Sequence, residues 1–149
     1  MHIESNVNLK QYNTLQIPVR AEYLVRIEDE SDIFELMESD LWKNEKHCIL
    51  NGWSNIFFTK DFDWVVIKVE LKWKKVIKSE NNLVFLEVAA GENWSDFVEW
   101  CCENNYCGIE NLIDIPWNVG TAPVSNIWAY GMEASDVVFE VEWIDLITW

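Results

Sequence analysis

The chain has 149 residues, half of them hydrophobic, and a net charge of −15 from 26 acidic and 11 basic residues. This length suits one domain with a buried core, or part of a larger protein. The acidic excess argues against nucleic acid or an anionic membrane as a partner, because both need clustered lysine and arginine. No apolar run approaches the roughly 18 residues that span a membrane, and residues 1–10 carry no secretory signal. We therefore expect a cytoplasmic protein.

The first part of the chain predicts the order β-α-β-loop-β-β. Residues 21–29 alternate apolar and polar side chains, as a half-buried strand does. Residues 31–42 place apolar side chains at helical spacing, with Ser31 as the candidate N-cap. Strand-like apolar runs follow at 46–50, 56–58 and 64–70.

The second part predicts a hairpin, a helix, a long loop and a final strand. The turn Asn81-Asn82 separates the strand patterns 74–80 and 83–90. An amphipathic helical pattern covers 93–105 and has its apolar face on Phe97, Val98, Cys101 and Cys102. The turn-rich stretch 108–131 is followed by strand-like alternation over 137–148.

Together these patterns predict an α+β fold with one subdomain over 1–70 and a second, incomplete one over 71–149. The chain ends directly after a predicted strand, so we expect a fragment of a longer protein. The basic stretch 72–78 fits a strand with a solvated lysine face better than a nucleic-acid site.

The sequence gives little support for a hydrolase active site or a metal site. The four cysteines lack zinc-ligand spacing and the two histidines form no ligand pair, so we expect no metal site and reduced, structural cysteines. Ser54 and Ser125 have neither a nucleophile elbow nor a histidine partner. The chain contains neither a GxxxxGK[ST] nor a GxGxxG phosphate-binding pattern.

Two loops remain as candidates for ligand binding. The first, "LNGWSN" (50–55), follows a predicted strand and would offer successive N–H groups and side-chain donors to an anion. Alone, it is at least as consistent with a plain turn. The second, "IPWNVGTAPVSNIWAYG" (115–131), is rich in small residues and ends in an aromatic residue followed by glycine. Two such loops, about 60 residues apart, fit a bound dinucleotide better than two unrelated turns.

The chain resembles, in order, the N-terminal half of the MurB family of UDP-N-acetylenolpyruvoylglucosamine reductases. The resemblance covers essentially all 149 residues, and its most specific part is "GIENLIDIPWNVGTAPVSNIWAYGME". It implies the PCMH-type (vanillyl-alcohol-oxidase-like) FAD-binding fold without the C-terminal substrate domain. The matching stretches are "NLKQYNTLQI" (8–17), "LNGWSNIFF" (50–58), "GENWSDFVEW" (91–100), 108–133 and "VEWIDLITW" (141–149).

The resemblance also implies roles for individual residues. Ser125 departs from the family's usual glutamine and Asn51 from its usual glycine. For Tyr130 the alternative is a core aromatic residue. The FAD pyrophosphate loop would be Asn51, Gly52, Trp53, Ser54 and Asn55. The flavin would be lined by Ile115, Pro116, Gly120, Thr121, Ala122, Asn126, Ala129, Tyr130 and Gly131.

In the family, NADPH reduces FAD, and the flavin passes hydride to the enolpyruvyl group of a UDP-sugar in peptidoglycan synthesis. The family's catalytic serine, arginine and glutamate belong to segments beyond residue 149. We therefore assign no catalytic residue and no oligomeric state, and expect this chain alone to be inactive. The alternatives are another PCMH-type flavin oxidoreductase, or a non-catalytic remnant of the fold that binds no flavin.

Tryptophan is abundant and glycine scarce, with 10 tryptophans and 5 glycines, although glycine usually makes up about 7% of a chain. Trp94 stands where the family often has tryptophan. We interpret the excess as glycine encoded by UGA and decoded as tryptophan; the alternative is an altered or decayed protein with genuine tryptophans. An indole at 53 or 128 would occupy cofactor space, whereas glycine at 53 would permit positive φ beside a pyrophosphate. The family usually has glycine at Trp53, Trp64, Trp73, Trp117, Trp128 and Trp149.

Overall fold

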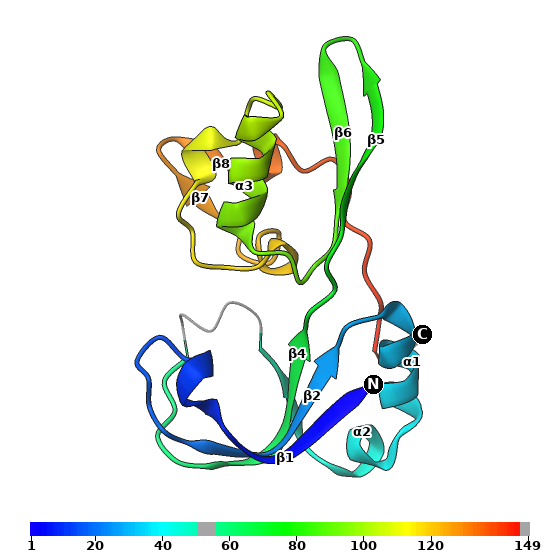
Figure 1. Ribbon diagram of the computed structural model, residues 1–149, viewed down its shortest axis with the longest axis vertical. Coiled ribbons are helices and arrows are strands. Elements are labelled where there is room, and N and C mark those ends of the chain that lie inside the picture. The colour runs from blue at the N-terminus through cyan, green and yellow to red at the C-terminus, as the bar shows by residue number, and fades with distance from the viewer. Residues whose placement is uncertain (51–55, 147–149) are drawn as a thin grey trace. The chain divides into compact units, whose positions relative to one another are not determined.

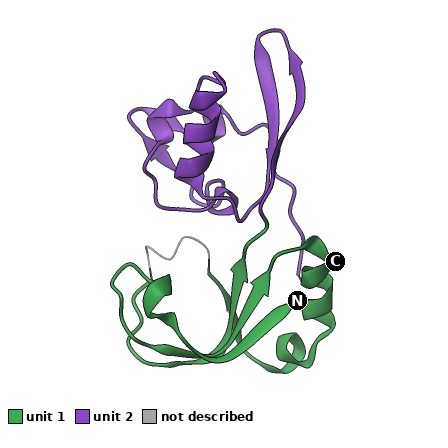
Figure 2. Ribbon diagram, viewed as in Figure 1, with its two compact units in different colours: residues 1–71 green, residues 72–149 purple. Residues whose placement is uncertain are grey.

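The computed structural model describes residues 1–50 and 56–146 (Figure 1). The chain divides into two compact units, residues 1–71 and 72–149, and we describe each by itself (Figure 2). Both units contain helices and strands, as the predicted α+β class requires. Among the described residues, no helix has the length and apolar character needed to cross a membrane.

Unit 1 is built on a four-stranded sheet in the order β1-β2-β4-β3. β1 pairs with β2 in antiparallel fashion, whereas β2, β4 and β3 run parallel to one another. The elements of the unit are β1 (His2–Asn8), the 3-10 helix η1 (Leu9–Tyr12), β2 (Arg20–Ile27), α1 (Glu30–Glu38), α2 (Asp40–Asn44), β3 (His47–Ile49) and β4 (Phe62–Val69).

Apolar side chains cover both faces of the central strands β2 and β4. On one face, Leu24 and Val66 pack in a cluster with Leu9 of η1. On the other face, Val25 and neighbouring apolar residues of β4 pack against Leu36 of α1. Burial on both faces explains why these strands carry nearly continuous apolar runs, as parallel strands usually do.

The predicted helix over 31–42 is two helices, α1 and α2. Ser39 separates them: its backbone is extended, its hydroxyl donates to the Leu36 carbonyl at 2.6 Å, and it accepts the Trp42 N–H at 3.3 Å. The predicted N-cap was also wrong, because Asp29, and not Ser31, caps α1 through a capping box.

Two further differences from the predicted order occur in unit 1. Residues 2–8 form the edge strand β1, which the sequence analysis did not predict. Most of its side chains are exposed, so no apolar alternation marked it. Residues 56–58 form no strand; Phe58 is buried and packs in the same cluster as Leu9.

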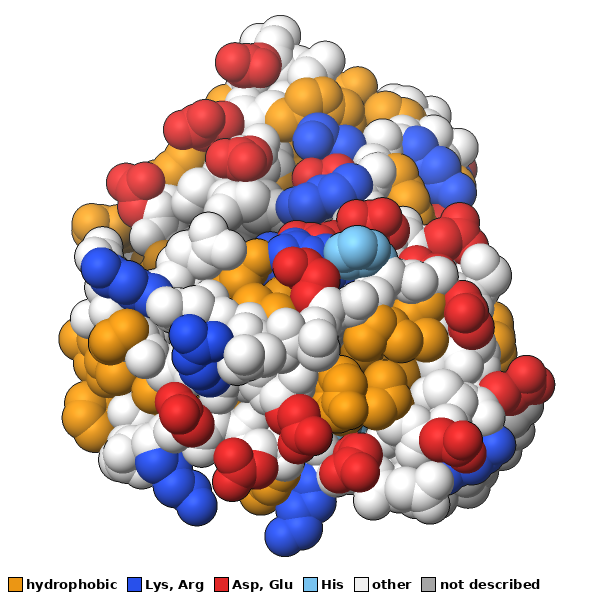
Figure 3. Space-filling view, turned by 60° about the horizontal axis from the view of Figure 1, so that its bottom comes forward, with side chains coloured by type: hydrophobic (Ala, Val, Ile, Leu, Met, Phe, Trp, Pro, Cys, Tyr) orange, Lys and Arg blue, Asp and Glu red, His pale blue; other side chains and the backbone are white. Residues whose placement is uncertain are grey.

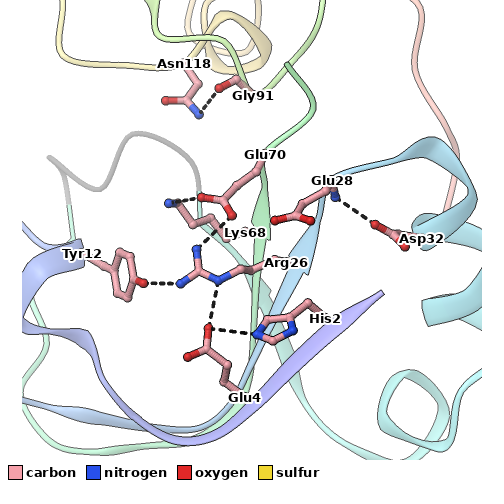
Figure 4. Close-up of polar contacts among 10 residues, drawn as sticks. All are labelled: His2, Glu4, Tyr12, Arg26, Glu28, Asp32, Lys68, Glu70, Gly91 and Asn118. Carbon is pink, nitrogen blue, oxygen red and sulfur yellow. Dashed lines mark hydrogen bonds and ion pairs between the residues drawn. The ribbon is translucent and has the colours of Figure 1, made fainter. Parts of the chain in front are cut away.

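A polar network joins β1, η1, β2 and β4 near the carboxyl ends of β2 and β4 (Figure 4). Arg26 donates from Nε to Glu4 and from Nη1 to Glu70, both at 2.9 Å, and from Nη2 to the Tyr12 hydroxyl. Lys68 donates to the other oxygen of Glu70. Burial alone would raise the pKa of the Glu70 carboxyl, but the hydrogen bonds from Lys68 and Arg26 hold it below its ordinary value.

We expect Glu70→Gln to lower the free energy of unfolding by about 1–3 kcal/mol at pH 7, because a charge-assisted contact to two cations is lost. The lowered pKa makes this contribution full above the ordinary value of 4.5 and lost as pH falls through the folded value. Urea unfolding between pH 3 and pH 7 measures both effects. Glu22→Gln, at an exposed position near the start of β2, is the matched control, and equal losses in the two variants would contradict the prediction.

Unit 2 combines a long hairpin, one helix and a series of short turns. Its core gathers Trp94, Val98 and Leu112 with further apolar residues, and the Trp94 indole donates to the Leu112 carbonyl at 2.7 Å. The elements are β5 (Lys74–Glu80), β6 (Leu83–Val88), α3 (Trp94–Glu103), β7 (Trp128–Ala129), β8 (Met132–Glu133) and the 3-10 helices η2 (Glu110–Leu112), η3 (Val119–Thr121) and η4 (Ala134–Asp136).

The predicted hairpin and helix of unit 2 are confirmed. Asn81 and Asn82 both have positive φ, 52° and 64°, as a type I′ turn between β5 and β6 requires. Asn93 caps α3 through its side chain. The predicted strand over 137–148 is not present over the described residues 137–146, which pair with no described strand.

The surface is predominantly acidic, as the net charge requires. Figure 3 shows aspartate and glutamate side chains spread over the face drawn, with lysine and arginine side chains between them. The lysines of β5 are part of this mixture, since Lys75 pairs with Glu87 at 2.9 Å and Lys78 with Glu80 at 2.7 Å. This arrangement matches the predicted solvated lysine face of that strand.

All four cysteines are free thiols, but their surroundings differ. Cys101 is buried in the core of unit 2, where burial and then the neighbouring Cys102 raise the pKa of its thiol to about 12. Cys102, which the sequence pattern placed on the apolar face of α3, is exposed, as is Cys107. Only one of the paired helix cysteines is therefore a core residue.

We expect the thiols of Cys102 and Cys107 to react with Ellman's reagent at pH 8 in the folded chain, while Cys101 stays protected until the chain unfolds. The raised pKa leaves roughly 1000-fold less thiolate at Cys101 than at an ordinary cysteine, and burial blocks access. A Cys102→Ala, Cys107→Ala double variant should lose the fast phase. A fast phase that survives in this variant would contradict the assignment.

Candidate functional site

The second candidate loop, residues 115–131, lies in unit 2 and is fastened to the start of α3. The Trp117 N–H donates to the Ile115 carbonyl at 2.8 Å, which makes a tight turn around Pro116. The Trp117 carbonyl in turn accepts the N–H of Trp94, the first residue of α3, at 2.9 Å. The Asn118 side chain donates to the Gly91 carbonyl at 3.3 Å (Figure 4).

Gly120 is needed because two backbone segments meet at its position. Its N–H donates to the Ala90 carbonyl at 2.9 Å, directly after the end of β6. A Cβ at position 120 would lie 2.7 Å from the Cβ of Ala90, a separation that two carbon atoms do not tolerate. The structure thus explains this glycine by packing within the protein, without any ligand.

Most backbone N–H groups of the loop are already engaged. Their acceptors are carbonyl groups of the loop itself or of the residues around the end of β6. These engaged N–H groups are not available to a phosphate, and the loop also offers side-chain surface to a ligand. The engaged N–H groups are those of Trp117, Val119, Gly120, Thr121, Ala122, Val124, Asn126 and Ile127.

The most exposed part of the site is the tip of the β7–β8 hairpin. Tyr130 and Gly131 form its two-residue turn, with φ of 50° and 79°. The Tyr130 side chain is 84% exposed and that of Trp128, on β7, is 74% exposed. Tyr130 is therefore no core residue, and it holds a positive φ that is unfavourable for an aromatic residue and typical of functional sites.

The other predicted flavin-lining residues divide into accessible and enclosed ones. Ala122 is 1% exposed and packs in the core of unit 2. Asn126 uses its side chain within the protein: the amide donates to Glu133 at 2.7 Å and accepts the Ser135 N–H at 2.9 Å. Accessible to some degree are Ile115, Pro116, Thr121, Ala129, Tyr130 and Gly131.

Sequence reasoning missed the two residues that hold this site in place. Ala90 meets Gly120, and Glu133 fixes Asn126. The small residues Ala89 and Ala90 before Gly91 could have indicated the contact between Ala90 and Gly120. Two backbone segments approach closely only where both carry small residues. The contact between Glu133 and Asn126 links the two ends of the short β7–β8 hairpin, and no sequence pattern indicated it.

The first candidate loop, Asn51, Gly52, Trp53, Ser54 and Asn55, lies outside the described residues. The chain enters it from β3, which pairs in parallel with β4. Leu50 extends that pairing by donating its N–H to the Ile67 carbonyl at 2.9 Å. Residue 50 is thus at the carboxyl end of a parallel strand, the end at which ligands of open α/β sheets bind.

The described tryptophans have contrasting environments. Trp94 is 3% exposed and hydrogen-bonded, whereas Trp64, Trp73 and Trp128 belong to the exposed large apolar residues. Among the described residues no tryptophan has a positive φ. The backbone at these positions therefore accepts a side chain, and only a need for space would call for glycine there.

We expect Gly120→Ala to destabilise unit 2 by about 1–3 kcal/mol, because the new methyl group overlaps Ala90. Amide exchange of α3 measures this loss. Adding Ala90→Gly removes the overlapping Cβ and should return part of the stability. Ser125→Ala in the same loop is the control and should have no effect, since Ser125 is exposed. A Gly120→Ala variant as stable as the parent would contradict the packing role.

Comparison with known proteins places the chain in a family. The chain is 43% identical over 148 residues to the UDP-N-acetylenolpyruvoylglucosamine reductase of Flavobacterium johnsoniae, covering 99% of this chain and 43% of that protein. The corresponding protein of Bdellovibrio bacteriovorus is 38% identical over 148 residues, covering 99% and 44%. These relatives confirm the predicted MurB resemblance, and the chain spans less than half their length.

The fold comparison agrees. The crystal structure of the MurB reductase from Thermus caldophilus superposes with a TM-score of 0.67 at 23% identity, covering 89% of this chain and 45% of that one. The predicted fold class is thereby confirmed. A family model described as FAD binding domain matches residues 21–146. Because this match covers most of the chain, the chain belongs to the FAD binding domain family.

Proposed function

We propose that this chain is the FAD-binding part of a UDP-N-acetylmuramate dehydrogenase that works in cytoplasmic peptidoglycan synthesis. The observation that carries the proposal is the family match over 21–146, together with relatives named as this reductase. The whole enzyme would take electrons from NADPH and reduce the enolpyruvyl group of a UDP-sugar. Its product would be required for cell-wall growth, and hence for cell shape and division.

The two candidate loops have separate roles toward the cofactor in this proposal. The pyrophosphate would be bound by Asn51–Asn55, which follow a parallel strand of unit 1. In unit 2, many N–H groups of 115–131 are engaged within the protein, so we propose that this loop contacts the flavin ring through its accessible side chains. FAD, when bound, supplies the chemistry of hydride transfer.

The exposed hairpin tip of unit 2 suits contact with a planar ring. Tyr130 presents an aromatic face, and Ala129 and Gly131 beside it are small enough to allow close approach. The turn fixes the backbone position of Tyr130. Less conformational entropy is therefore lost when the Tyr130 ring contacts a ligand. Trp128, two residues before Tyr130 in the chain, is also exposed, and its indole would occupy space that the cofactor needs in this proposal.

We also propose that six tryptophans of the printed sequence are glycines in the native protein. Support comes from the contrast between buried, hydrogen-bonded Trp94 and the exposed Trp64, Trp73 and Trp128. Trp64 and Trp73 contact neighbours such as Phe62, Lys46 and Lys75 at the surface, and an exposed indole adds apolar area. The codons of all ten tryptophans in the source DNA test this directly. UGA at the six positions and UGG at Trp94 would support it, whereas UGG throughout would refute it.

We expect a variant with glycine at 53, 64, 73, 117, 128 and 149 to retain about one FAD per chain through desalting, whereas the chain as printed should retain much less. Absorbance at 450 nm and quenching of flavin fluorescence measure this. Trp128→Gly and Trp143→Gly form a matched single pair, because the two side chains are 74% and 73% exposed. Only the first should improve FAD affinity, since Trp143 lies outside the predicted site.

The same experiment separates the alternatives. A folded six-glycine variant that retains no flavin would favour the non-binding remnant and refute the proposed cofactor role. Retained flavin that NADPH cannot reduce, after the missing part of the protein is added, would favour another flavin oxidoreductase of the same fold. Circular dichroism shows whether each variant is folded.

A further inference from the structure

The amino group of Met1 is held by two carboxylates of α1. Its ammonium nitrogen lies 2.5 Å from Oδ1 of Asp32 and 2.8 Å from Oε2 of Glu35. The Met1 side chain is only 4% exposed and packs against the apolar cluster that contains Val25 and Leu36. The side chain is therefore engaged in the core of unit 1 while the ammonium is engaged on the helix.

Asp32 is placed at the start of α1 as an acceptor of hydrogen bonds. It is buried, and its Oδ2 accepts the N–H of Glu28 at 2.9 Å (Figure 4) and that of Asp29 at 3.0 Å. The bond from Asp29 is half of the capping box of this helix. A buried carboxylate needs partners for both of its oxygens, and the Met1 ammonium supplies the partner of Oδ1.

The ammonium also balances the charge of this segment. Residues 28–35 contain five carboxylates and no lysine or arginine. Among the described residues, the ion pairs formed by lysine and arginine involve neither Asp32 nor Glu35. Hydrogen bonds to Asp32 and then to Glu35 raise the pKa of the Met1 amino group to about 10. The same ammonium is the largest of the effects that lower the pKa of the Asp32 carboxyl below its ordinary value.

We propose that Asp32 and Glu35 form a binding site for a free α-ammonium, that Met1 occupies this site, and that acylation of the amino group empties it. The site recognises a primary ammonium, which brings a positive charge and three N–H donors. A formyl or acetyl group removes the charge, leaves one N–H and deprives two carboxylates of their cation. This inference does not rest on the proposed function.

Acylation would loosen the first residues of the edge strand β1. This strand pairs with one neighbour, β2, and most of its side chains are exposed. The ammonium adds an attachment to α1 directly before His2, the first residue of the strand. β1 also carries Glu4, which accepts the Nε–H of Arg26 in the polar network. The amino group thereby supports the strand that contributes Glu4 to this network.

The reactivity of the amino group tests whether it is bound. Acetic anhydride is added at pH 7 to the folded 149-residue chain, in which intact mass shows a free Met1. We expect Met1 to react roughly 100-fold more slowly than in the urea-unfolded chain, because a pKa of about 10 against an ordinary 8.0 leaves less free amine. Glu35→Gln should raise the rate several-fold, whereas Glu38→Gln, also exposed on α1, should not. Equal rates in the folded and unfolded chains, or equal effects of the two substitutions, would overturn the proposal.

Amide hydrogen exchange, resolved by residue with NMR, measures the structural consequence. A co-expressed Nα-acetyltransferase supplies the acetylated chain with unmodified lysines, and the free chain is the reference. We expect acetylation to make the amides of β1 exchange at least about tenfold faster, while those of β4 keep their rates and show that unit 1 is folded. In Glu35→Gln the effect of acetylation should be smaller, because one of the two partners is already missing. Unchanged exchange of β1 on acetylation would overturn the proposal.

Discussion

The parallel pairing of β2 with β4 is the constraint on which unit 1 depends. Both strands are buried on both faces, so the two apolar clusters, the helices and the edge strands are all arranged around them. The same pairing fixes which residues meet at the carboxyl ends of the strands. There, Arg26 and Lys68 stand beside each other in the ladder and share the carboxylate of Glu70. These two cations neutralise the carboxylate at this end of the strands, which reduces repulsion among acidic groups in a chain with a net charge of −15.

Unit 2 depends on a different kind of contact, the close approach of two backbones at Gly120 and Ala90. Where these segments touch, many N–H groups of the loop donate to carbonyls of the loop or of the residues after β6. Rigidity and phosphate binding compete for the same N–H groups. In the loop 115–131, N–H groups that hold the loop in place are therefore not available to a phosphate.

Prediction from sequence succeeded where local patterns agreed with tertiary packing. The hairpin around Asn81 and the cap at Asn93 rest on turn and capping chemistry that acts within a few residues, and both were found. The edge strand β1 was missed because its pairing with β2 is a long-range event that leaves most of its side chains exposed. The split at Ser39 was missed because a hydroxyl can serve a helix end or a helix surface equally well in a sequence.

For the candidate site too, the sequence predicted some features and the structure was needed for others. Its position along the chain followed from the family resemblance, which reports the order of residues and not their exposure. The structure added that Ala122 is enclosed, that Asn126 is engaged within the protein and that Tyr130 is accessible. The contrast between the tryptophans has the same origin. Resemblance identifies where a glycine is expected, and only a structure shows that Trp128 is exposed with a backbone that does not itself require glycine. If the native residue at position 128 is glycine, as we propose, the reason for it would be space for a ligand and not the backbone conformation.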